Sequence, residues 1–118
     1  MHIDPRIAPD PDLDSAQFGL CQSLTRADRF KVRHLVIRPG ATIDTHSHFH
    51  RAEHWIAVQG SGRVTLDGQS QELFENQSID IAVGTQHRIE NHGKVDLHLI
   101  EVQTGTYLDD DDVIRPSS

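Results

Sequence analysis

From Phe18 onward the chain alternates apolar and polar residues with a period of two, and turn-forming residues interrupt the alternation at intervals of roughly ten residues. Between positions 30 and 37 the even-numbered residues share one face of a predicted strand, and the odd-numbered residues, including Lys31 and Arg33, share the other. The pair Asp67-Gly68 is a strong signal for a two-residue hairpin turn. No segment holds a helical apolar period, so the pattern predicts an all-β fold of about eight or nine short strands, as in sandwiches and barrels.

Length and local composition indicate one folded domain between two flanking segments. A chain of 118 residues has room for a single hydrophobic core. Prolines and aspartates crowd residues 1–15, which predicts an N-terminal arm. We expect the domain to cover residues 16–108, and an acidic tail to follow over 109–118, where the run of aspartates is most simply a solvated segment.

Charge and hydropathy exclude several classes of function. A net charge of −7, with only 11 lysines and arginines, argues against a nucleic-acid partner, which would call for a basic face. No apolar run is long enough for a signal peptide or a membrane span, so we expect no membrane partner and a cytoplasmic location. Cys21 is the only cysteine and cannot form an internal disulfide.

Two histidine-containing runs predict a metal site built from four residues. His46 and His48 stand two positions apart, so on a strand both imidazoles point the same way, and Glu53 follows after a short turn. His87 adds a fourth ligand from a distant strand. Three imidazoles and one carboxylate suit a borderline divalent metal, so we expect one such ion, zinc first, with manganese, iron or nickel as alternatives.

Neighbouring residues leave alternatives open. His50 rivals His46, because His48 and His50 are also spaced as a strand pair, and it is otherwise expected to line the pocket. His54 is out of phase with Glu53 and should point away from the site.

The two runs, once placed on strands, resemble the paired motifs of the cupin superfamily. The first cupin motif is glycine, five residues, His-x-His, three or four residues, glutamate, six residues and glycine. This chain matches it at every spacing, with Gly40, His46, His48, Glu53 and Gly60. The second motif is looser, because Asn76 stands where glycine is usual and Ala82 where proline is usual, but Gly84, His87 and Asn91 match. The resemblance implies a single-domain double-stranded β-helix, or jelly-roll barrel.

The likeness is closest to the cupin domain of type II mannose-6-phosphate isomerases, the kind often fused to a mannose-1-phosphate guanylyltransferase. The phrases that carry it lie at residues 28–32, 50–55 and 100–108, and it covers most of the chain from Phe18 to Arg115. The fused family usually has glutamine where this chain has His46. An imidazole is the better ligand for a transition metal, so this difference preserves the metal site.

The resemblance implies a metal-dependent isomerase that interconverts an aldose and a ketose and acts on a sugar phosphate. Glu101 and His50 are the candidates for the catalytic base, and Glu101 faces either the interior or solvent. Arg51, Arg88 and Lys31 are the candidates for binding the anionic substrate, although each could also be a solvated side chain. A proline-rich arm and an exposed sheet edge are what a strand-exchanging homodimer would use.

Two other classes of function fit the same four ligands. A cupin dioxygenase would hold iron or nickel and leave coordination positions open for substrate and dioxygen. A sugar-binding or regulatory cupin would keep the metal without turnover. The identity of the metal distinguishes the isomerase from the dioxygenase, because zinc is redox-inert.

Overall fold

The computed structural model describes residues 18–109 and 112–115, and within these ranges the chain is all-β, as predicted. The expected N-terminal arm lies outside the described residues. Nine strands follow one another along the chain: β1 (Gly19–Arg26), β2 (Phe30–Ile37), β3 (Thr42–His46), β4 (Arg51–Gln59), β5 (Gly62–Leu66), β6 (Gln69–Leu73), β7 (Ser78–Ile81), β8 (His87–Glu90) and β9 (Leu97–Gly105). No helix that could cross a membrane occurs in these ranges.

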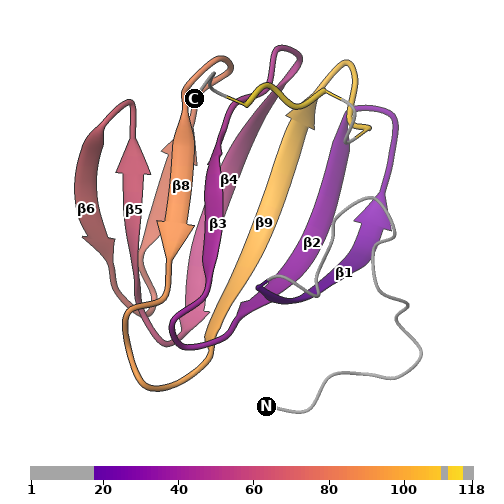
Figure 1. Ribbon diagram of the computed structural model, residues 1–118. Helices are drawn as coiled ribbons and strands as arrows, with labels where there is room; N and C mark the ends of the chain where they lie inside the picture. Colours follow the sequence, from indigo (N-terminus) through magenta and orange to yellow (C-terminus); the bar gives the residue numbers. More distant parts are fainter. Residues whose placement is uncertain (1–17, 110–111, 116–118) are drawn as a thin grey trace.

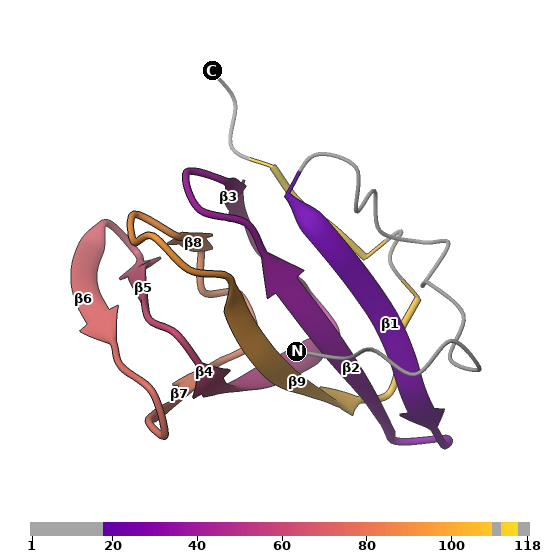
Figure 2. The same ribbon diagram turned by 90° about the horizontal axis from the view of Figure 1, so that it is seen from below.

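The strands form two antiparallel sheets that face each other. One has five strands in the order β1-β2-β9-β4-β7, and the other has four in the order β3-β8-β5-β6 (Figure 1). Figure 2, seen from below, shows the two sheets curving around a shared interior. The central pairs β2–β9 and β4–β9 join strands that are distant in the sequence, which is the arrangement of a jelly roll.

The backbone dihedral angles confirm the hairpin turn that was predicted between β5 and β6. Asp67 and Gly68 both have positive φ, 47° and 84°, as a type I′ turn requires. Asn76 also has a positive φ, of 70°, which explains why asparagine can replace the glycine that is usual there.

The interior is apolar at one end and polar at the other. On β2 the inward residues change from Lys31 and Arg33 to Leu35 and Ile37, all of them buried. Strand β9 repeats the change in reverse order because it runs antiparallel, so that Leu35 pairs with Leu99 and Arg33 with Glu101. Trp55 is buried and belongs to the apolar core, and its indole donates to Glu101 of the polar end. The polar end is where β9 ends and β4 begins, and the candidate site lies there.

One sequence-based assumption about this end was wrong. The prediction placed both His46 and His48 on one strand, but β3 ends at His46. Ser47 forms an isolated bridge with Ile114, and the carbonyl of His48 accepts a hydrogen bond from the amide of Gly84. The backbone groups of this segment therefore find partners outside the sheet, yet the two imidazoles still converge.

Candidate metal centre

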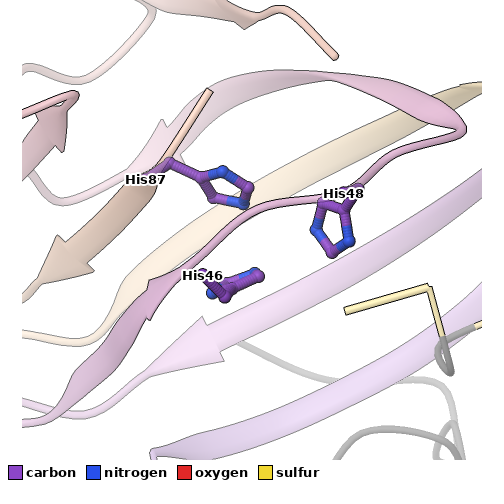
Figure 3. Close-up of side chains that lie close together, drawn as sticks. All are labelled: His46, His48 and His87. Carbon is purple, nitrogen blue, oxygen red and sulfur yellow. The ribbon is translucent and has the colours of Figure 1, made fainter. Parts of the chain in front are cut away.

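Three of the four predicted ligands gather into one cluster. One ring nitrogen from each of His46, His48 and His87 lies within 4.8 Å of the others. Figure 3 shows the rings around one space, with His46 at the end of β3, His48 two residues beyond that end and His87 at the start of β8. His48 and His87 are buried, and His46 is partly exposed.

Backbone carbonyls set the orientation of all three imidazoles. Nδ1 of His46 lies 2.7 Å from the carbonyl oxygen of Asp44, Nδ1 of His48 lies 2.6 Å from that of Asp112, and Nδ1 of His87 lies 3.0 Å from that of Thr85. Because a carbonyl oxygen can only accept, each Nδ1 carries the proton and donates it. When the ring is neutral, its Nε2 therefore keeps a lone pair, which is the arrangement that protein metal sites use to fix a histidine ligand.

Glu53 lies beside this cluster, on the opposite sheet. Its Oε2 accepts a hydrogen bond of 3.0 Å from Nε of Arg51 and forms an ion pair of 2.9 Å with Nη2 of the same residue. Its Oε1 lies 3.2 Å from Nε2 of His87, and among the described residues neither of these two buried atoms has a hydrogen-bond partner. Two acceptors that face each other without a donor need a proton or a cation between them.

The pKa shifts of the clustered side chains indicate that His46 is neutral, so its ring can bind a cation in place of a proton. Burial, with a further contribution from His87, lowers the pKa of His46 to about 4, so this imidazole is neutral at physiological pH. Burial alone would raise the pKa of Glu53, but His87 and Arg51 outweigh it and lower the pKa, so the carboxylate stays ionised. Burial also opposes the charged form of His87, yet the Glu53 carboxylate raises the pKa of His87.

The donor set fits a divalent metal. One ionised carboxylate oxygen and three ring nitrogens, all held in place and three of them buried, are the ligands that zinc and related ions prefer. The three histidines could therefore form a metal site, with Glu53 beside His87 and His48.

The three positively charged side chains that were predicted to bind the substrate point to different faces of the sheets. Lys31 and Arg51 are buried in the interior, and Nη2 of Arg51 donates to Nε2 of His48 over 3.2 Å. Arg88 follows His87 on β8 and therefore points to the opposite face, where its Nη2 lies 3.8 Å from Glu90. The structure does not bring Arg88 to the cluster.

Of the two candidate bases, Glu101 faces the interior. Its Oε1 accepts from Arg33 Nε at 2.8 Å and from Gln103 Nε2 at 2.7 Å, and its Oε2 accepts from Trp55 Nε1 at 2.9 Å. The Trp55 ring lies 5.5 Å from that of His87, which connects this network to the cluster. Glu101 is thus held by three donors beside the candidate metal centre.

The two histidines closest to the cluster in the sequence, His50 and His54, are held by carboxylates. His50 is 55% exposed, and its Nδ1 lies 3.1 Å from Asp112. His54 points away from the site, as predicted, and its Nδ1 lies 2.7 Å from Asp80 on the outer face.

Sequence reasoning missed Asp112. The acidic run to which it belongs was expected to be solvated, but Asp112 is buried and its carbonyl orients His48. The only hint in the sequence is the apolar pair Val113-Ile114 directly after the aspartates, since a segment that remains in solvent rarely needs such residues. Residues 110, 111 and 116–118 of the predicted tail lie outside the described residues.

Comparisons with known proteins agree with this fold. Residues 15–117 match the family model described as "Mannose-6-phosphate isomerase C-terminal". A mannose-1-phosphate guanylyltransferase from Sinorhizobium fredii is 50% identical over 98 residues, which are 83% of this chain and 19% of that protein. The chain thus spans about a fifth of the length of the curated relatives that it matches.

Solved structures of cupins share the fold at low sequence identity. KdgF from Halomonas superposes with a TM-score of 0.72 at 18% identity, covering 78% of this chain and 82% of that one. A sugar phosphate isomerase of the cupin superfamily from Silicibacter pomeroyi gives a TM-score of 0.63 at 20% identity, covering 73% and 60%. The fold is a cupin, and with the family match over residues 15–117 the chain belongs to the family of mannose-6-phosphate isomerase C-terminal domains.

Proposed function

We propose that this chain is a metal-dependent cupin that isomerises a sugar phosphate, with mannose 6-phosphate as the first substrate to test. The observation that carries the proposal is the unpaired contact of Glu53 Oε1 with His87 Nε2 beside the other two histidines. The family description and the sugar phosphate isomerase among the structural relatives support this class of substrate.

One divalent ion, zinc in the first instance, would be held by His46, His48, His87 and Glu53. Manganese, iron or nickel would fit the same ligands. A divalent metal bound there supplies stabilisation for negative charge on adjacent substrate oxygens. Arg51 neutralises the second oxygen of Glu53 and so keeps Oε1 directed at the cluster.

Proton transfer between neighbouring carbons requires a base within the interior, and we assign that role to Glu101. Among the described residues its Oε2 accepts one hydrogen bond, from Trp55, so a lone pair is left for the substrate. His50 is the weaker candidate, because it is largely exposed and already paired with Asp112. Lys31 and Arg51, both buried at the polar end, are the proposed partners of the substrate phosphate.

The test begins with the metal content of protein purified without added metal. Conversion of mannose 6-phosphate to fructose 6-phosphate is then measured in the metal-loaded and metal-stripped protein. We expect about one equivalent of metal, turnover only in the loaded form, and no turnover by Glu101→Gln. His54→Ala is the matched control, because His54 contacts Asp80 on the outer face.

Different failures point to different alternatives. Bound iron without isomerisation would favour the dioxygenase class, and stoichiometric zinc without turnover on any sugar phosphate would favour a sugar-binding module. A protein that binds no divalent metal would refute the proposal as a whole.

A homodimer in the cytoplasm remains part of the proposal. Apolar side chains on the outer face of the five-stranded sheet support association, because Ile56 and Val58 on β4 are both more than a third exposed. Light scattering at several protein concentrations tests the oligomeric state.

A further inference from the structure

The segment that follows β9 lies against the turn that carries the metal ligands. Ser47, which stands between His46 and His48, exchanges two backbone hydrogen bonds of 2.9 Å with Ile114. Figure 1 shows this yellow segment crossing the end of the molecule where β3 ends and β4 begins. The segment is thus placed to control the conformation of residues 47–50.

Asp112 makes most of the contacts with this turn. Its carboxylate accepts hydrogen bonds from the amide of Phe49, at 3.0 Å, and from the amide of His50, at 2.8 Å. Nδ1 of His50 lies 3.1 Å from the same carboxylate, whose side chain is only 3% exposed. The carbonyl of Asp112 meanwhile accepts from Nδ1 of His48. One residue therefore binds the turn by its side chain and the ligand by its backbone.

Asp109, three residues earlier, offers a matched contrast. Its side chain is 53% exposed and forms a surface ion pair of 2.8 Å with Arg26. It belongs to the same segment, but its side chain pairs with Arg26 rather than with residues 47–50. The burial and the contacts of Asp112 are therefore not general properties of the acidic run.

We propose that Asp112 is a positioning residue of the metal centre, which holds His48 in the tautomer and orientation that a metal requires. The proposal rests on the metal site proposed above. Without the carboxylate, the amides of Phe49 and His50 lose their acceptor, and the turn must move to give them other partners. The carbonyl of Asp112 then no longer lies opposite Nδ1 of His48, and the ring is free to change tautomer or to rotate.

The first experiment measures zinc affinity of the full chain by competition with a chromophoric chelator. We expect Asp112→Ala to bind zinc about ten- to a hundredfold more weakly than the unchanged protein. Asp112→Asn keeps one acceptor oxygen and should fall between the two. Asp109→Ala should bind zinc as the unchanged protein does.

A second measurement does not depend on metal. Long-range ¹H–¹⁵N correlation spectra of the metal-free protein report which nitrogen of His48 carries the proton. We expect a protonated Nδ1 in the unchanged protein and in Asp109→Ala, and a mixture of tautomers in Asp112→Ala. If Asp112→Ala does not fold, the same comparison is made with Asp112→Asn, which has nearly the same shape.

The two readouts separate the two proposals. If the unchanged protein binds no zinc, the proposed metal function fails, and the His48 tautomer alone decides the role of Asp112. If zinc binds but Asp112 and Asp109 variants show the same affinity and the same His48 tautomer, the positioning role is overturned while the metal site stands.

Discussion

Removing Arg33 tests the buried network that holds Glu101 beside the candidate metal centre. Arg33 and Glu101 are paired across β2 and β9, and their side chains are each only 3% exposed, with Nη2 and Oε1 2.7 Å apart. Arg33→Met keeps much of the side-chain volume but leaves an ionised carboxylate in the interior without its cation. We therefore expect a large loss of stability.

The size of the loss follows from the burial of the pair. Removing one partner of a buried ion pair costs about 3–5 kcal/mol, because the remaining charge is uncompensated. For a domain of this size each kcal/mol lowers Tm by about 4 °C, so the Tm should fall by roughly 12–20 °C. The exposed pair of Arg26 and Asp109 gives the control, and Arg26→Met should cost less than about 1 kcal/mol.

Urea unfolding followed by fluorescence measures both variants. Trp55 is the only tryptophan and donates to Glu101, so its emission reports the same network. The double variant Arg33→Met, Glu101→Leu should recover part of the loss, since it removes the unpaired charge. If Arg33→Met proves as mild as Arg26→Met, the reasoning from burial is refuted.

Three further predictions concern the site and its supports. His87→Ala should abolish stoichiometric zinc binding and His54→Ala should not, as measured by elemental analysis; equal occupancy in both would mean that the ligands are misassigned. Burial opposes ionisation of Asp112, but hydrogen bonds from two backbone amides outweigh burial and lower the pKa of the carboxyl group. The stability that the ionised carboxylate contributes is therefore present above about pH 4 and is lost as the pH falls below that value. The gap in unfolding free energy between the unchanged protein and Asp112→Asn should accordingly shrink in acid, and a gap that does not depend on pH would contradict this. Gly105→Ala should cost about 1–3 kcal/mol in urea unfolding, because the added Cβ would collide with the carbonyl of His50, directly before β4. Unchanged stability would contradict the close contact between Gly105 and His50.

Much of the fold could be predicted because it depends on local chemistry. Strand alternation identified β2 and its two faces, and Asp67-Gly68 identified the hairpin from the dihedral angles that such a turn needs. The same alternation places Arg51 on the same face of β4 as Glu53, where both are buried. It places Arg88 on the face of β8 that points away from His87. Strand alternation alone could therefore have separated Arg88 from the site, although both arginines were predicted to bind the substrate.

The contacts that complete the site could not be read from local patterns. The burial of Asp112 depends on a segment that returns to residues 47–50 after the last strand, and no periodicity encodes such a contact. The pairing of Glu101 with Arg33 likewise depends on which strands become neighbours in the sheet. Both are long-range contacts that only the topology determines.

The position of β9 has a consequence for how the protein is made. This strand lies between β2 and β4, although it is the last of the nine strands in the described part of the chain. Until it emerges, β2 and β4 lack the neighbour that joins them, and their apolar faces and unpaired edges stay open to other chains. At translation rates of about 5–20 residues per second this interval is on the order of seconds, long enough for chaperones to bind. We therefore expect nascent chains that stop before β9 to be captured by chaperones or to aggregate, and folding to follow once β9 has emerged.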